Sequence, residues 1–166
     1  MFYLFDTCAL NHIRELQENK IIDLRNIILQ FRIGITNAIV KEWENYGLVH
    51  FFSPENCYLI PIQNHDIDGM IARFPFFNDF DEADQTLLWA SMQDSSVIIS
   101  DDGGLNAAAL SVGKKAIFLP DLLIYLVKEG FLNKNEVRKA LKFWKEVHRY
   151  NKSSHKRWLK SLNLII

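Results

Sequence analysis

Four short apolar runs separated by helix-like segments constrain the fold of this chain more than any other feature. The runs are Phe2–Phe5, Arg32–Thr36, Ser96–Ser100 and Lys115–Leu119. Apolar runs of this length are typical of strands that are buried on both faces of a sheet. Strands that alternate with helices form a mostly parallel sheet. The sequence therefore predicts an α/β protein in which helices flank a sheet of about four to five strands.

Helical periodicity and helix-ending residues predict the segments between and after these strands. The predicted helices are Asn11–Glu18, Ile21–Phe31, Asn37–Tyr46, Asp81–Gln93, Leu105–Val112 and Asp121–Glu129, followed by a basic helix that Asn133 or Asn135 caps and that runs to about Tyr150. Gly47, Gly113 and Gly130 stand where three of these helices would end, a position that favours glycine.

Residues 48–80 do not follow the alternation of strands and helices. Three prolines interrupt this stretch, which contains an extended segment at Cys57–Ile62 and a short helical pattern near Asp66–Arg73. The pattern leaves its place in the fold open.

Length and composition indicate one compact unit. The 166 residues are 49% hydrophobic, which is enough apolar surface for one substantial core. We take residues 1–130 as the α/β domain and residues 131–166 as a basic helical extension packed on it. No apolar run approaches 18 residues and the N-terminus does not resemble a signal peptide, so we expect a cytoplasmic protein without a membrane span. Cys8 and Cys57 lack metal-ligand spacing and are expected to be buried or half-buried thiols.

The formal net charge of −1 hides an uneven distribution of charge. Residues 134–160 contain ten lysines and arginines against Glu136 and Glu146, a local charge of +8, which leaves −9 for the rest of the chain. A basic end beside an acidic body suits a protein that binds a polyanion, although a solvated helical face explains the basic residues equally well. The spacing predicts a basic stripe that binds RNA, formed by Arg138, Lys142, Lys145 and Arg149.

Acidic residues follow the ends of the predicted strands. Asp6 follows the first strand, Glu42 lies in the helix after the second, Asp84 opens the helix before the third, and Asp101 and Asp102 follow the third. Sites in parallel sheets form at the carboxyl ends of the strands. Crowded carboxylates repel one another unless a hard cation neutralises them, and oxygen ligands suit Mg²⁺ or Mn²⁺. The pattern predicts metal-assisted attack of water on a phosphodiester.

Each of these acids also has an ordinary structural explanation. Asp84 suits the first turn of a helix, and Asp101 with Asp102 before two glycines suits a turn. Glu42 suits an exposed helical face. Only Asp6 has no evident capping role, so it is the joint arrangement of the four acids that favours a site.

The residues around the acids resemble the four motifs of PIN-domain nucleases, in the same order. The matching segments are FDTCAL at residues 5–10, IT at 35–36 with VKE at 40–42, DQTLLWA at 84–90 and IISDDGGL at 98–105. The resemblance spans residues 2 to 120. It implies a three-layer α/β/α fold and a ribonuclease that depends on Mg²⁺ or Mn²⁺.

The resemblance also implies roles for individual residues. Asp6, Asp84 and Asp102 would hold the metal ion or ions, and Glu42 would bind it directly or through water. Hydroxyl groups and further acids close by would orient these carboxylates, namely Thr7, Thr36, Ser100, Asp81 and Asp101.

Two choices between neighbouring acids follow from spacing. Asp102 is preferred to Asp101 because it stands three residues before Leu105, which should pack into the next helix. Glu42 is preferred to Glu44 because two positions turn a helix by about 200°. Asn11 is close to the first motif and either contacts a ligand or caps a helix.

The resemblance implies several partners and leaves the biological role open. Some PIN nucleases are toxins that a small antitoxin protein silences, and others process RNA. RNA, an antitoxin protein and a second copy in a homodimer are therefore the expected partners. Trp144 and Trp158 lie among the basic residues, where packing in the core or an interface is favoured over stacking on bases.

Other α/β classes lack the residues that they need. A dehalogenase-type phosphatase requires a second aspartate where Cys8 stands, and a dinucleotide-binding domain requires a glycine-rich turn after the first strand. The five histidines form no recognisable cluster. The alternative that stays open is a PIN-like module that binds RNA or protein without catalysis, because fold does not imply function.

Overall fold

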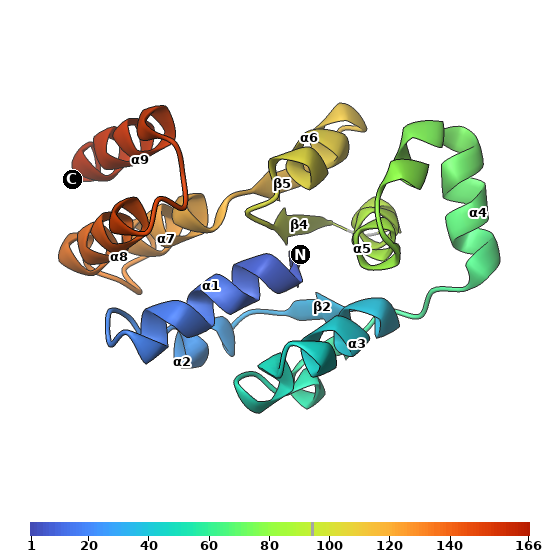
Figure 1. Ribbon diagram of the computed structural model, residues 1–166, viewed down its shortest axis with the longest axis horizontal. Helices are drawn as coiled ribbons and strands as arrows, with labels where there is room; N and C mark the ends of the chain where they lie inside the picture. The colour runs from blue at the N-terminus through green and yellow to red at the C-terminus, as the bar shows by residue number, and fades with distance from the viewer. Residues whose placement is uncertain (94) are drawn as a thin grey trace.

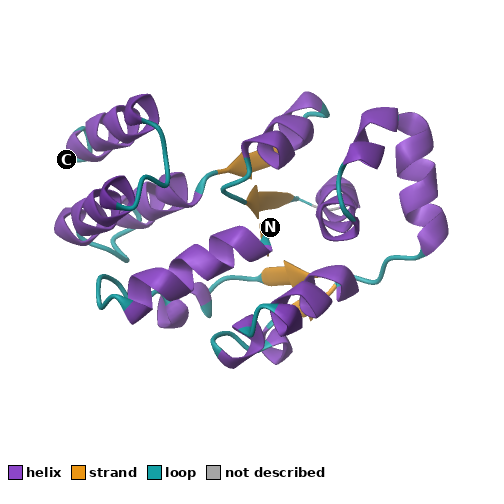
Figure 2. Ribbon diagram, in the orientation of Figure 1, coloured by secondary structure: helices purple, strands orange, loops and turns teal. Residues whose placement is uncertain are grey.

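The computed structural model describes residues 1–93 and 95–166, in which five strands form one sheet in the order β3-β2-β1-β4-β5 (Figures 1 and 2). The strands are β1 (Phe2–Phe5), β2 (Ile33–Ile35), β3 (Tyr58–Leu59), β4 (Ser96–Ile99) and β5 (Lys115–Ile117). All four neighbouring pairs are parallel. The predicted α/β class with a mostly parallel sheet is confirmed, and the helices are compatible with a three-layer α/β/α arrangement.

Helices account for most of the remaining described residues. They are α1 (Thr7–Glu18), α2 (Arg25–Ile28), α3 (Asn37–Asn45), α4 (Asn64–Arg73), α5 (Glu82–Gln93), α6 (Gly103–Ser111), α7 (Leu119–Lys128), α8 (Lys134–Glu146) and α9 (Lys152–Asn163), with short 3₁₀ turns at Leu48–His50, Pro54–Asn56 and Pro75–Asp79. Helices α7, α8 and α9 pack on one another at one end of the molecule, and α4 lies near the other end (Figure 1). In the described part of the chain no helix has both the length and the apolar character that crossing a membrane requires.

The centre of the sheet is fully apolar. Leu4 of β1 and Ile98 of β4 are inaccessible to solvent, as expected for strands covered on both faces. A Cβ atom at Gly34 of β2 would lie 2.8 Å from Leu4 Cδ2 and 2.7 Å from Ile60 Cδ1. Glycine therefore lets the side chains of β1 and the segment after β3 close over β2.

The predicted helix Ile21–Phe31 is largely wrong. Only the four residues of α2 are helical. The reason is the way in which α1 ends: Lys20 adopts a positive φ of 56°, and the amides of Ile21 and Ile22 both donate to the Leu16 carbonyl. The apolar residues of this stretch are buried as a closing turn instead of a helical face.

The basic helix also differs from its prediction, because α8 ends at Glu146 and not near Tyr150. His148 takes a positive φ of 53°, the Arg149 amide donates to the Trp144 carbonyl, and the chain then starts α9 at Lys152. This closing motif normally uses glycine, so the sequence carried no signal for it.

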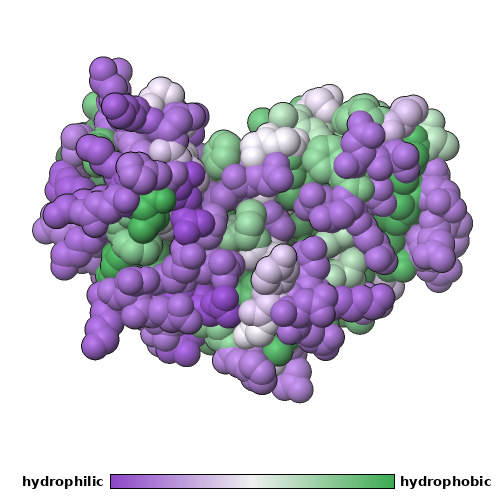
Figure 3. All heavy atoms as spheres, in the orientation of Figure 1, coloured by the Kyte–Doolittle hydropathy of each residue, from purple (hydrophilic) through white to green (hydrophobic). Residues whose placement is uncertain are grey.

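The two tryptophans of the extension are buried. Trp144 is 0% and Trp158 is 1% exposed, so the packing interpretation is correct and neither ring is available to stack on a base. The opposite faces of α8 and α9 are polar, and Figure 3 shows mainly hydrophilic side chains over this end of the molecule. The extension therefore combines an apolar inner face with a basic outer face.

Candidate active site

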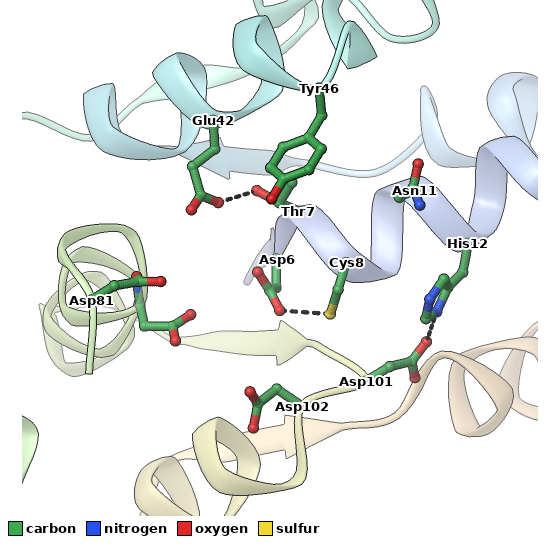
Figure 4. A pocket seen from close by; sticks show the side chains of 11 residues that line it. Asp6, Thr7, Cys8, Asn11, His12, Glu42, Tyr46, Asp81, Asp101 and Asp102 are labelled. Atoms are coloured by element: carbon green, nitrogen blue, oxygen red, sulfur yellow. Dashed lines mark hydrogen bonds and ion pairs between the residues drawn. The ribbon is translucent and has the colours of Figure 1, made fainter. Parts of the chain in front are cut away.

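A pocket of about 450 Å³ lies where β1 and β4 end (Figure 4). These adjacent strands finish level with each other, since Phe5 pairs with Ile99, and the chain leaves them in opposite directions across the sheet. Such a switch point is where parallel sheets form ligand sites. The pocket is lined by Asp6, Thr7, Cys8, Asn11, His12, Glu42, Tyr46, Asp81, Asp84, Asp101 and Asp102. All four predicted metal ligands are among these residues, and no lysine or arginine is.

Asp6 is buried directly after β1. It occupies the N-cap position of α1, but its side chain does not cap the helix. Instead its Oδ2 accepts hydrogen bonds from Ser100 Oγ at 2.7 Å and Cys8 Sγ at 2.8 Å. Burial raises the pKa of Asp6, and these hydrogen bonds oppose the rise. Ser100 thus holds a carboxylate, in the role that the sequence suggested for it.

Glu42 reaches the pocket from α3. Its Oε2 accepts a hydrogen bond of 2.5 Å from Thr7 Oγ1, so Thr7 also contacts the carboxylate that it was expected to orient. Burial raises the pKa of Glu42, and the charges of Asp81 and Asp6 raise it further. Glu44 is exposed on α3 and does not line the pocket.

Asp84 lies among the other acids at the start of α5. It lies in the first turn of α5, where its amide donates to Asp81 Oδ1 at 2.9 Å. Burial raises the pKa of Asp84 to about 8, with further contributions from the charges of Asp6, Asp81, Asp102 and Glu42. Within the described residues its carboxylate accepts no hydrogen bond. Without a cation, Asp84 therefore carries a proton through much of the neutral pH range.

Asp102 caps α6 and faces the other acids. Its Oδ1 accepts hydrogen bonds from the amides of Gly104 at 2.6 Å and Leu105 at 3.0 Å. Its Oδ2 has no hydrogen-bond partner among the described residues. Leu105 is fully buried, as the preference for Asp102 assumed. One oxygen of Asp102 is thus held by the helix while the other is available to a ligand.

Asp101 points away from Asp102, toward the C-terminal part of the chain (Figure 4). Its carboxylate accepts hydrogen bonds from His12 Nδ1 at 2.5 Å, Tyr150 Oη at 2.7 Å and the Leu119 amide at 2.9 Å. Asp101 therefore ties the loop after β4 to three other segments of the chain. We name these contacts the Asp101 network.

Arg149 extends the Asp101 network to a second acid. It donates to His12 Nε2 and, at 2.6 Å, to Glu15 Oε2. Because arginine only donates, His12 accepts through Nε2 and carries its proton on Nδ1, facing Asp101. Arg149, which the sequence placed in the basic stripe, thus makes hydrogen bonds within the protein.

The structure also places Thr36 and Asn11. Thr36 Oγ1 caps α3 and is 2.7 Å from Thr86 Oγ1 of α5, so it joins two helices and contacts no carboxylate of the described residues. Asn11 lies inside α1, which excludes the cap role, and it lines the pocket. The three stripe residues of α8 are exposed outside the pocket: Arg138, Lys142 and Lys145.

Sequence reasoning missed three residues of the pocket wall. Cys8 and His12 are four residues apart on α1, and Tyr46, the residue that ends α3, is four residues after Glu42, so each pair shares a helical face. Extending the two acidic motifs by one helical turn would have identified all three. The half-buried state expected of Cys8 and Cys57 is confirmed.

The donors fit a hard cation in their chemistry, although they are not gathered into a coordination sphere. Among the described residues no group of three or more histidine, cysteine, aspartate or glutamate side chains could hold a metal ion as it stands. Carboxylate oxygens are nevertheless the ligands that Mg²⁺ and Mn²⁺ prefer, and a divalent charge would offset both the burial and the repulsion that raise the pKa of Asp84.

Comparisons of the chain with protein-family models, with characterised proteins and with solved structures find no match. The function must therefore be inferred from the residues of the pocket and from the resemblance of the motifs.

Proposed function

We propose that this protein is a metal-dependent endoribonuclease and that the acidic pocket is its active site. The observation that carries the proposal is the gathering of Asp84 with four other carboxylates in one pocket, where burial and their charges raise the pKa of Asp84 to about 8. Such crowding destabilises a folded protein unless a ligand offsets it. A divalent cation is the ligand that suits an acidic pocket without lysine or arginine in its walls.

The chain itself holds three of the four proposed ligands in place. Ser100 and Cys8 hold Asp6, Thr7 holds Glu42, and the amides at the start of α6 hold Asp102. Asp6, Asp84 and Asp102 would bind the ion, and Glu42 would bind it directly or through water. A bound divalent cation lowers the pKa of a water molecule and neutralises charge on a phosphoryl group. The hydrogen bonds to the carboxylates limit the reorganisation that ligand binding requires.

RNA is the substrate that two features support. The motifs resemble those of PIN nucleases, and the exposed side chains of Arg138, Lys142 and Lys145 provide positive charge outside a pocket that repels phosphates. Contacts between lysine or arginine and phosphates supply most of the sequence-independent affinity for nucleic acids. The basic face of α8 would therefore hold the backbone of the RNA while the pocket acts on one phosphodiester.

The proposal is tested by calorimetric titration with Mn²⁺ together with cleavage of a labelled single-stranded RNA. We expect Mn²⁺ to bind, cleavage to require Mg²⁺ or Mn²⁺, and EDTA to abolish it. Glu42→Gln should reduce cleavage strongly, whereas the matched control Glu44→Gln, two positions away on the exposed side of α3, should not. Undiminished cleavage in EDTA would exclude the metal mechanism. RNA binding without Mn²⁺ binding or cleavage would support the silent module instead.

A further inference from the structure

Besides its acids, the pocket is lined by Asn11, His12 and Tyr46, which we name the neutral wall. Asn11 and His12 project from α1, and the ring of Tyr46 extends from the end of α3 toward Thr7 (Figure 4). Sites for small organic ligands have volumes of roughly 300–1,000 Å³. The pocket, at about 450 Å³, therefore has room for more than a cation.

Tyr46 is a large side chain held in an exposed position. It is 62% exposed, and none of the described aromatic rings pairs with it. Its backbone is nevertheless fixed, because its amide donates to the Glu42 carbonyl at 3.0 Å and its carbonyl accepts from Arg14 Nη1 at 3.1 Å. The ring is thus presented at the pocket without being used for packing.

Arg14 fixes both sides of the neutral wall. Besides the Tyr46 carbonyl, it donates through Nη2 to Asn11 Oδ1 at 2.6 Å. Since arginine can only donate, this bond assigns the amide orientation of Asn11 and leaves Nδ2 as its donor group. Nδ2 has no acceptor among the described residues, so the neutral wall offers both an unused hydrogen-bond donor and an unused aromatic face.

We propose that the neutral wall is a nucleoside subsite, in which Tyr46 stacks on the base that adjoins the phosphodiester held at the acids. The inference rests on the proposed function. A nucleotide joins a charged phosphate to a neutral planar base, and the two walls of the pocket match these two parts. Aromatic side chains bind single-stranded nucleic acids in this way, with little dependence on sequence because every base has a π-face.

The test measures binding of a fluorescently labelled single-stranded RNA oligonucleotide by anisotropy, in an Asp84→Asn background that prevents turnover. We expect Tyr46→Ala to weaken binding about tenfold, or about 1.4 kcal/mol, and Tyr46→Phe to keep the parent affinity because the ring remains. The matched control is Tyr58→Ala, another exposed tyrosine, which lies on the edge strand β3 and should leave affinity unchanged. An oligonucleotide with abasic positions should bind Tyr46→Ala and its parent equally.

Two results would overturn the subsite. Parent-like affinity of Tyr46→Ala excludes a contact with RNA, and an equal loss for Tyr46→Ala and Tyr46→Phe excludes stacking. The subsite and the nuclease can fail separately. Tyr46-dependent binding without Mn²⁺ binding or cleavage would retain the subsite and reject the nuclease. Metal-dependent cleavage together with an RNA affinity that Tyr46→Ala leaves unchanged would retain the nuclease and reject the subsite.

Discussion

Asp84 determines how the metal-free protein should respond to pH. Its pKa is about 8 in the folded protein, against about 3.9 for an aspartate in an unfolded chain. Between these values the folded state binds more protons, so its stability is complete at low pH and falls as pH rises through about 8. We expect the melting temperature in EDTA to fall over this range and Asp84→Asn to flatten the fall. Glu44→Gln is the control variant. A fall of melting temperature with pH that is as steep in Asp84→Asn as in the parent would contradict the raised pKa of Asp84.

Replacing Asp101 and replacing its neighbour Asp102 should have different effects on stability and on metal affinity. Asp101→Ala leaves three buried donors unpaired, and we expect a loss of about 2–4 kcal/mol in the free energy of unfolding. Asp102→Ala removes a helix cap, which costs about 1 kcal/mol, but it also removes a proposed ligand. Urea unfolding should single out Asp101, and Mn²⁺ calorimetry should single out Asp102. Equal losses of Mn²⁺ affinity in both variants would show that the ordering is wrong.

The sequence predicted individual residues best where position along a strand defines them. Asp6 and Asp102 follow strands whose ends meet at the same edge of the sheet, so their place in one pocket could be expected. The link between Asp101 and His12 could not, because 89 residues separate the two and neither has a local signal. Tyr46 was missed although its spacing from Glu42 was available.

Replacing basic residues on α8 and the arginine that follows it should separate RNA binding from folding stability. Arg138 is exposed on α8 and donates to the amide oxygens of Asn135 and Asn163, whereas Arg149 bonds to His12 and to the carboxylate of Glu15. Replacing Arg138, Lys142 and Lys145 with glutamine should lower the salt dependence of RNA binding by about two to three counterions and leave Mn²⁺ affinity unchanged. Arg149→Gln should instead lower the free energy of unfolding by about 1–3 kcal/mol with little effect on the salt slope.

The control for the α8 variant is a triple replacement of exposed lysines elsewhere, Lys20, Lys41 and Lys115, which should change the slope less. If Arg149→Gln lowers the salt dependence of RNA binding as strongly as Arg138→Gln does, Arg149 belongs to the RNA-binding surface. No change in slope for the triple α8 variant would leave this face solvated or bound to a protein partner.

Elements were predictable where burial alone decides them. The run Phe2–Phe5 is a strand with the predicted bounds because every position lies inside the sheet. The end of α8 was missed because a histidine takes the left-handed conformation that glycine usually marks. The helix predicted after α1 was wrong for the opposite reason. Its apolar residues have the spacing of a helical face, but in the structure they are buried in a turn that closes α1.

At the scale of the molecule, the parallel sheet was predictable and the strand order was not. The order depends on which distant strands pair, and β3 contributes only two exposed residues to the edge of the sheet. That edge strand belongs to residues 48–80, whose irregular pattern had left them unplaced. The short helix expected near Asp66–Arg73 is confirmed as α4.

Metal binding should stabilise the whole molecule. A ligand that binds only the folded state adds about 2.7 kcal/mol at a concentration of 100 times its dissociation constant. We expect Mn²⁺ to raise the melting temperature of the parent protein and to leave Asp6→Asn unchanged. In EDTA, Asp6→Asn should melt at the same or a higher temperature than the parent, because it relieves repulsion. A clear fall for Asp6→Asn in EDTA would indicate a structural role for Asp6.

The contacts of Arg149 and Tyr150 have a consequence for how the protein is made. A ribosome releases Asp6 more than 140 residues before Tyr150, at about 5–20 residues per second. During that interval β1 and β4 can pair, but the carboxylate of Asp101 and the ring of His12 have none of their C-terminal partners. A growing chain can thus form the sheet while the back of the pocket is still open. The site is complete only after Arg149 and Tyr150 have been synthesised.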